Sequence, residues 1–156
     1  MNTVNESIEV DVPLRTAYNQ WTQFEEFPQF MEGVKSVTQV EDTVLRWVAE
    51  VGGEQQEWQA EIVDQEPDRR IAWEAVGGNG PNGAVTFERV DEGTTRIDVA
   101  FEWKPEGAKE SLGAFLGLDS RKVKSDLARF KELIETRGFE TGAWRGEVHR
   151  GTTTRR

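Results

Sequence analysis

The sequence AYNQWTQFEEFPQFMEGV, at residues 17–34, is the segment from which the architecture is most directly inferred. It carries six large apolar or aromatic side chains between Tyr18 and Met31, with Pro28 in its second half and Gly33 near its end. Two short helices cannot cover that many large side chains by themselves, so these side chains must close against a concave surface. The segment therefore predicts a lid or seam over a hydrophobic cavity.

The flanking residues predict where the helices of this segment begin and end. Ahead of it, residues 6–12 alternate between apolar and polar, which indicates a half-buried strand. Pro13 suits the first turn of a helix, because that turn does not use the backbone N–H that proline lacks. Pro28 permits a second short helical turn, and Gly33 ends it.

Residues 34–103 read as a succession of strands joined by short turns. Apolar and polar side chains alternate in each strand, and the polar positions are strongly charged, so one face of the sheet is expected to meet water. Gly52-Gly53 is typical of a two-residue hairpin turn, whereas residues 77–83 predict an irregular loop. An antiparallel meander is therefore predicted, with strands at 34–40, 44–51, 57–62, 71–75, 85–89 and 96–103.

A long amphipathic helix is predicted within residues 107–137. Asp119 is a candidate N-cap for a restarted segment of this helix, and Gly138 ends it. Apolar residues recur on one face at helical spacing, at Val123, Leu127, Phe130 and Ile134. The predicted fold is α+β: an antiparallel sheet of about seven strands wrapped around this helix, with two short helices after the first strand.

Residues 1–138 are expected to form the folded domain, and residues 139–156 a disordered basic tail. The tail lacks apolar periodicity and is rich in glycine, threonine and arginine. Trp144 is the only tryptophan of this tail, and the sequence leaves open whether it docks on the domain or stays mobile.

Composition narrows the classes of partner. The net charge is −10, from 19 basic and 29 acidic residues, and a surface this acidic repels the phosphate backbone of nucleic acids. The chain has no cysteine, which excludes disulfides and thiolate metal sites and makes a cytoplasmic location the default expectation. No window approaches the ~20 apolar residues of a membrane span, and the first residues do not resemble a secretory signal.

Few residues offer acid–base or metal chemistry. His149 is the only histidine and lies in the predicted tail, so neither a Ser-His-Asp arrangement nor a histidine metal site is expected. Tyr18 is the only tyrosine; it either donates its hydroxyl to a ligand or fills the seam between the first helix and the sheet. We expect neither a metal nor a cofactor.

The order of elements and several short motifs resemble the START-like (SRPBCC) superfamily, which has the helix-grip fold. Within it, the chain is most similar to the polyketide cyclase/dehydrase and lipid-transport group, which includes coenzyme-Q-binding proteins. The resemblance covers about residues 3–138 and is carried by residues 18–21, 24–34, 46–47, 57–58, 70–73 and 130–138. It implies a deep cavity between the long helix and the sheet that binds a hydrophobic or polycyclic molecule.

The candidate ligand-binding residues are large side chains that the strand and helix patterns direct inward. Aromatic rings combine a large apolar surface with, in tryptophan and tyrosine, a polar group that can orient a ligand. The candidates are Tyr18, Phe30, Met31, Trp47, Trp58, Trp73, Phe87, Phe101, Trp103, Phe115 and Leu118. No position matches a catalytic motif, so the catalytic residues stay unassigned.

Three functions remain open at this point. The first is binding or carriage of a small hydrophobic molecule, such as a lipid, a quinone or a polyketide-like compound. The second is catalysis as an aromatase-type polyketide cyclase or dehydratase, which would work largely by holding reactive carbons close together. The third is an interaction module whose pocket has collapsed. The sequence is equally compatible with a monomer and a homodimer.

Overall fold

The computed structural model describes residues 2–76, 81–103, 119–150 and 152–154. Its elements are β1 (Asn2–Val10), α1 (Leu14–Trp21), the 3-10 helix η1 (Phe24–Gln29), β2 (Val34–Glu41), β3 (Val44–Val51), β4 (Glu54–Glu66), β5 (Arg70–Ala75), β6 (Asn82–Asp91), β7 (Thr94–Trp103), α3 (Ser120–Arg137), β8 (Glu147–His149) and β9 (Thr152–Thr154). The predicted α+β architecture is confirmed, with two short helices after the first strand.

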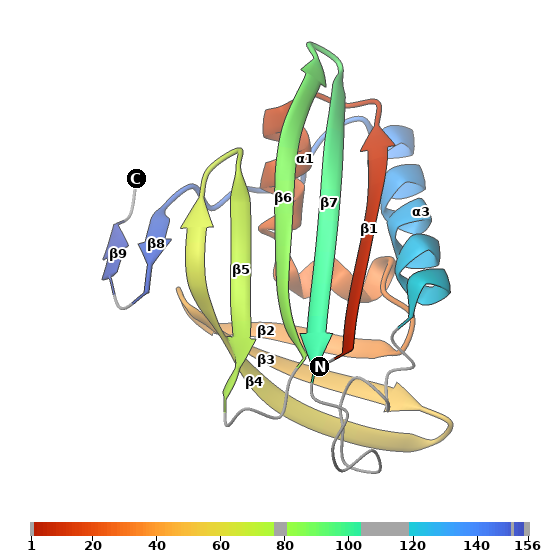
Figure 1. Cartoon of the computed structure of the whole chain (residues 1–156), viewed down its shortest axis with the longest axis vertical. Coiled ribbons are helices and arrows are strands. Elements are labelled where there is room, and N and C mark those ends of the chain that lie inside the picture. Colours follow the sequence, from red (N-terminus) through yellow and green to blue (C-terminus); the bar gives the residue numbers. More distant parts are fainter. Residues whose placement is uncertain (1, 77–80, 104–118, 151, 155–156) are drawn as a thin grey trace.

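The seven long strands form one antiparallel sheet in the order β1-β7-β6-β5-β4-β3-β2. Figure 1 shows this sheet bending sharply, so that β2, β3 and β4 run across the lower end while β1, β6 and β7 stand upright, with α1 behind β6 and α3 beside β1. β4 is the longest strand, at 13 residues, and its pairing with β5 shifts register between Ile62 and Asp64. A bulge at such a point lets a strand change direction, which gives the sheet its concave side.

The predicted hairpin turn between β3 and β4 is confirmed. Gly52 and Gly53 both have positive φ, at 59° and 85°, as a two-residue turn of the I′ kind requires. β3 and β4 then pair in continuous register from Val51↔Glu54 to Val44↔Glu61. This register places Trp47 directly opposite Trp58.

The aromatic side chains of residues 17–34 are buried on the concave side. Trp21 lies with its ring 4.7 Å from that of Phe130 and 5.5 Å from that of Phe30, between centroids. Phe27 packs edge-on against Trp21 at 5.9 Å and also contacts Trp47. These ring contacts join residues 17–34, which we call the lid segment, both to α3 and to the sheet, where the sequence predicts a lid or seam.

Helix α3 begins and ends as its sequence predicts. The Asp119 side chain accepts a hydrogen bond from the Lys122 backbone N–H at 2.8 Å, and Gly138 takes a left-handed conformation with φ 79°. The buried face consists of Val123, Leu127, Phe130 and Ile134. Residues 107–118 of the predicted helix and most of the predicted loop at 77–83 lie outside the described residues. Among the helices of the described chain, none is long and apolar enough to cross a membrane.

The prediction of a disordered tail is wrong for residues 139–150 and 152–154. β8 pairs with β4 at Gln65↔Val148 and Asp64↔His149, and Val148 is buried. The physical reason is the length of β4: β3 covers it only as far as Glu61, which leaves the later edge of β4 free to pair with another strand. Three-residue strands carry too short a pattern to be recognised by periodicity.

Residues 139–146 are held to α1 by polar contacts. The Arg145 guanidinium donates to Asn19 Oδ1 at 2.6 Å and to Asp68 Oδ2 at 2.7 Å, and it lies 5.5 Å from the centre of the Tyr18 ring. The Trp144 backbone N–H donates to Thr22 Oγ1 at 3.1 Å, and its side chain is half-buried. Trp144 therefore docks on the domain.

We expect Arg145→Ala to lower the free energy of unfolding by about 2 kcal/mol, because it strands the Asp68 carboxylate and the Asn19 amide oxygen. Urea denaturation monitored by circular dichroism measures this loss. Arg69→Ala is the matched control, since Arg69 makes only an exposed ion pair with Glu66, and it should change the value by less than about 0.5 kcal/mol. Equal effects of the two substitutions would show that the Arg145 contacts contribute no more to stability than an exposed ion pair does.

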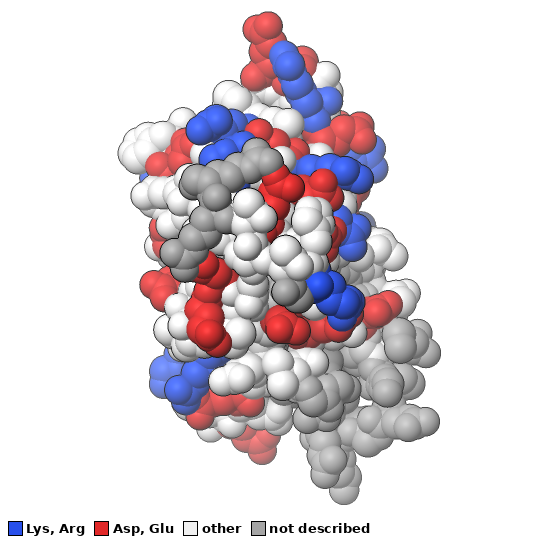
Figure 2. All heavy atoms as spheres, turned by 90° about the vertical axis from the view of Figure 1, so that its left-hand side faces the viewer, with Lys and Arg blue, Asp and Glu red and all other residues white. Residues whose placement is uncertain are grey.

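The outer surface carries mixed charge. Exposed ion pairs such as Arg46–Glu57 and Arg150–Glu74 lie on the solvent side of the sheet, where water screens them. Figure 2 shows one face of the molecule on which the described lysine and arginine side chains are scattered among aspartate and glutamate. The acidic residues of the strands thus occupy the solvated face that the alternation predicts.

Candidate functional site

A cavity lies on the concave side of the sheet, beneath α3 and beside the lid segment. Its volume is about 50 Å³. Side chains from α1, from residues 30–34, from five strands or their flanks, and from α3 surround it. The described residues that line it are Trp21, Phe30, Met31, Val34, Trp47, Trp58, Trp73, Pro81, Val99, Phe101, Lys122, Val123, Asp126 and Leu127.

Three tryptophans on adjacent strands form one wall. Trp47 stacks on Trp58 with ring centres 5.7 Å apart and planes within 9°, and on Trp73 at 6.5 Å and 29°. These are the offset-stacked distances at which indole rings attract one another. Trp58, at one end of the stack, is half-buried, so the wall reaches from the core to the mouth of the cavity.

Trp73 is held in place by a glycine on the next strand. Gly83 pairs with Trp73 across β5 and β6, and a Cβ atom at Gly83 would lie 2.3 Å from Trp73 Cζ2. The indole can lie against the β6 backbone only because residue 83 has no side chain. Phe101 packs edge-on against the same indole at 6.0 Å.

Six of the predicted ligand-binding residues line this cavity: Phe30, Met31, Trp47, Trp58, Trp73 and Phe101. Three others do not. Phe87 is buried 5.3 Å from the ring of Tyr18, and Trp103 is buried at the end of β7, where it pairs with β1. Phe115 and Leu118 lie outside the described residues.

Tyr18 is the third predicted residue that lies away from the cavity. Its hydroxyl accepts a hydrogen bond from Gln65 Nε2 at 3.0 Å, and its side chain is fully buried. Burial raises the pKa of Tyr18 to about 12, with the hydrogen bond from Gln65 and the charge of Arg145 acting in the opposite direction. Tyr18 therefore fills the seam between α1 and the sheet, as one of the two interpretations of the sequence proposed.

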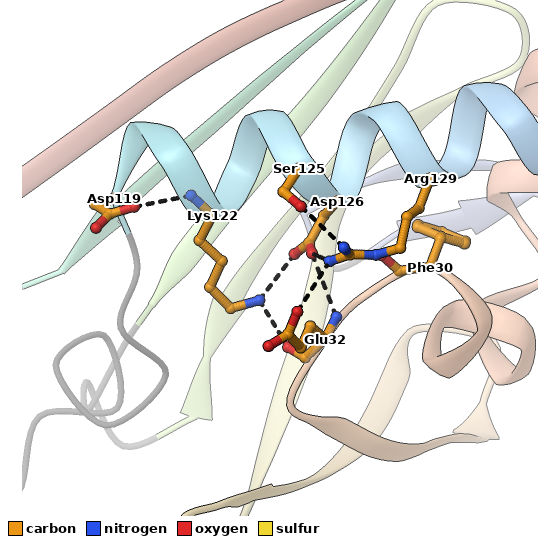
Figure 3. A network of polar contacts seen from close by, with 7 residues as sticks. All are labelled: Phe30, Glu32, Asp119, Lys122, Ser125, Asp126 and Arg129. Atoms are coloured by element: carbon orange, nitrogen blue, oxygen red, sulfur yellow. Dashed lines mark hydrogen bonds and ion pairs between the residues drawn. The ribbon is translucent and has the colours of Figure 1, made fainter.

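The polar side of the cavity comes from α3, through Lys122 and Asp126. The Lys122 ammonium donates to the Glu32 backbone carbonyl at 2.7 Å and to Asp126 Oδ2 at 2.9 Å. Asp126 Oδ1 accepts from the Glu32 N–H at 3.3 Å and from Arg129. Figure 3 shows these residues converging between α3 and the lid segment, with Arg129 also donating to the Phe30 carbonyl at 3.1 Å.

These contacts attach the lid to the helix. We call Lys122, Asp126 and Arg129, together with the backbone of Phe30 and Glu32, the latch. Lys122 and Asp126 are 18% and 15% exposed, so their ion pair is largely sheltered from water. Such a pair interacts more strongly than a surface pair, and removing one partner leaves a charge without compensation.

Sequence reasoning missed Lys122 and Asp126 because their i, i+4 spacing is typical of a solvated ion pair on a helix surface. The available signal was their position beside Val123 and Leu127, which the helical pattern places in the core. The strand and helix patterns do not mark five further lining residues as part of a site: Trp21, Val34, Val99, Val123 and Leu127. Pro81 falls in the loop predicted at 77–83.

Two of the tryptophans that line the cavity have an indole N–H without an acceptor among the described residues. They are Trp21 and Trp47, whose Nε1 atoms are fully buried. Buried donors in folded proteins nearly always have a partner, so each of these calls for one, such as a water or a ligand oxygen. Among the described residues there is also no group of three or more side chains placed to hold a metal ion.

Comparisons with known proteins assign the chain to a family. The model of the family described as polyketide cyclase / dehydrase and lipid transport matches residues 10–132. An uncharacterized 17.2 kDa protein of Streptomyces lincolnensis, from the melC2-rnhH intergenic region, is 51% identical over 149 residues, which span 95% of this chain and 99% of that protein.

Solved structures show the same fold at low sequence identity. The Zhui aromatase/cyclase of Streptomyces sp. R1128 superposes with a TM-score of 0.70 at 18% identity, over 91% of this chain and 98% of that one. A START superfamily protein of Mycobacterium smegmatis gives 0.67 at 16% identity, over 86% and 97%. The architecture is thus the START-like helix-grip fold, and the chain belongs to the polyketide cyclase/dehydrase and lipid-transport family.

Proposed function

We propose that this protein binds and carries a small hydrophobic molecule, such as a lipid, a quinone or a polyketide-like compound, in the cavity between the sheet and α3. The observation that carries the proposal is the lining: nearly all of the described lining side chains are apolar or aromatic. Each CH₂ group that a guest removes from water there contributes about 0.8 kcal/mol. The unsatisfied indole donors and the latch supply the few polar groups that orient a guest in such a site.

The size of the cavity determines how a guest enters. Pockets for drug-sized ligands measure roughly 300–1,000 Å³, whereas this one measures about 50 Å³. A guest larger than a few water molecules therefore has to displace the lid or Trp58. The lid can open only if the contacts of the latch break, and Trp58 is the half-buried end of the tryptophan stack. We therefore expect one of these two parts to move when a guest enters.

Tryptophan emission tests the proposal, because three indoles stack beside the cavity. Titration with quinones, fatty acids and polycyclic aromatics should quench or shift the emission at micromolar concentrations, and native mass spectrometry of freshly purified protein should detect a co-purified guest. If no compound changes the emission and no guest co-purifies, the pocket is collapsed and the protein is an interaction module, the alternative that the small volume favours.

A pair of substitutions distinguishes an effect on guest binding from an effect on the stability of the fold. We expect Leu127→Phe, at the lining, to weaken guest binding at least tenfold. Ile134→Phe is the matched control, since Ile134 is buried on the same helix but does not line the cavity. Both substitutions overpack the interior by a similar amount and should cost about 1–3 kcal/mol of stability. Equal losses of binding would mean that the guest lies elsewhere.

Catalysis by a polyketide cyclase or dehydratase is the second candidate, supported by family membership and by the aromatase/cyclase fold neighbour. In the described lining, only Lys122 and Asp126 carry titratable side chains. The test is the product distribution from a poly-β-keto thioester with the wild-type protein and with Asp126→Asn. An identical distribution with and without the wild-type protein argues against catalysis.

A further inference from the structure

We propose that the cavity selects guests that carry an anionic oxygen, with Lys122 as the anchoring cation and the indole N–H groups of Trp21 and Trp47 as additional donors. The inference rests on the proposed function and names the chemical class of its guest: an apolar ring or chain that ends in a carboxylate or an enolate. Three observations carry it.

The first observation is the balance of donors and acceptors around the cavity. Asp126 is the only described lining residue whose side chain bears an oxygen, and both of its oxygens already accept hydrogen bonds. Lys122 uses two of its three ammonium donors, on Glu32 and Asp126, and the third has no partner among the described residues. With Trp21 and Trp47, the described part of the site has three donors without an acceptor, whereas each Asp126 oxygen already accepts at least one hydrogen bond. A guest that satisfies this site brings acceptors.

The second observation is the charge of the latch. Lys122, Arg129 and Asp126 are mostly sheltered, with side-chain exposures of 18%, 37% and 15%. The Glu32 carboxylate, 3.6 Å from Arg129, is 80% exposed, so water screens it. Lys122, Arg129 and Asp126 therefore sum to one positive charge, partly screened by water at Arg129, and of the two cations Lys122 lines the cavity. An anion there is stabilised, whereas a cation is repelled.

The third observation is that the lysine is held where a guest would meet it. Its ammonium is fixed by the Glu32 carbonyl and Asp126, at the boundary between α3 and the lid segment (Figure 3). A guest oxygen at the remaining N–H would find the donor already oriented, so little side-chain entropy is lost on binding.

The experiment compares three probes with the same ring system: 2-naphthoate, 2-methylnaphthalene and the (2-naphthyl)methylammonium ion, each titrated into the full chain at pH 7.5. Affinity is measured by calorimetry, and the six tryptophan indole N–H resonances are followed by ¹H–¹⁵N NMR. We expect 2-naphthoate to bind at least tenfold more tightly than either other probe. We also expect it to shift the Trp21 or Trp47 indole resonance downfield.

Variants assign the preference to Lys122. Lys122→Met keeps the apolar stem and should bring 2-naphthoate to within about twofold of 2-methylnaphthalene, while Lys122→Arg should retain the preference. Lys124→Met is the matched control, because Lys124 lies on the same helix, is 69% exposed and does not line the cavity. It should leave all three affinities unchanged.

The possible outcomes distinguish this inference from the proposed function. If 2-methylnaphthalene and 2-naphthoate bind the wild-type protein equally, or if the preference survives in Lys122→Met, the inference is overturned while hydrophobic binding stands. If none of the three probes binds, the proposed function itself fails, and the inference fails with it.

Discussion

Replacing Trp21 with alanine should lower the free energy of unfolding by about 4 kcal/mol, a large share of the roughly 5–15 kcal/mol by which folded domains are stable. Trp21 is 1% exposed, and its ring contacts those of Phe27, Phe30, Phe87 and Phe130. The substitution removes the group through which α1, η1, the sheet and α3 meet, and the surrounding rings cannot all move in to fill the space.

Urea denaturation monitored by circular dichroism measures this effect, with Trp144→Ala as the matched control. Trp144 has the same side chain, but it is half-buried on the C-terminal segment rather than in the core. We expect the control to cost about 1 kcal/mol. A loss of similar size in both variants would mean that the ring cluster around Trp21 is not the centre of the fold.

The second large effect concerns the latch. Asp126→Ala removes the one carboxylate of the latch and leaves Lys122 and Arg129 as neighbouring cations, 18% and 37% exposed. We expect a loss of about 3 kcal/mol in the free energy of unfolding, near the lower end of what breaking a buried ion pair costs. The same change removes the acceptor of the Glu32 backbone N–H and the anion that orients Lys122 and Arg129, so the lid is held less tightly and the association rate of a hydrophobic guest should rise severalfold.

Equilibrium denaturation and stopped-flow tryptophan fluorescence measure these two quantities. Asp98→Ala is the control, because Asp98 pairs with Arg96 on the solvated face and both side chains are more than 40% exposed. It should change neither quantity appreciably. A slower association rate in Asp126→Ala would indicate that the guest does not enter past the lid.

The strands and the aromatic wall follow from the sequence because side chains in a strand alternate with a period of two. That period places Trp47, Trp58 and Trp73 on one face, and the structure stacks them together. The alternation does not show where on that face of the sheet a residue lies. Phe87 has the same parity as these tryptophans, but it packs beneath α1 against Tyr18 and Trp21 instead of beside the cavity.

The latch and the C-terminal segment could not be predicted in the same way, because both depend on contacts between distant parts of the chain. In the sequence, Lys122 and Asp126 look like a solvated ion pair. In the structure both bind the backbone of Glu32, which precedes Lys122 by 90 residues. Strand β8 needs the free edge of β4, which exists only because β3 stops pairing at Glu61. No local sequence pattern indicates either of these contacts.

Because Gly83 lies against Trp73, the size of the residue at position 83 affects the width of the cavity. Any larger residue at 83 must push the Trp73 ring away from β6, and that ring is part of the cavity wall. Within a family that shares this scaffold, exchange at a single residue that never touches the guest can thus reset which guests are admitted. Gly83 is therefore the first position to substitute when a protein of this family is redesigned to bind a wider or narrower guest.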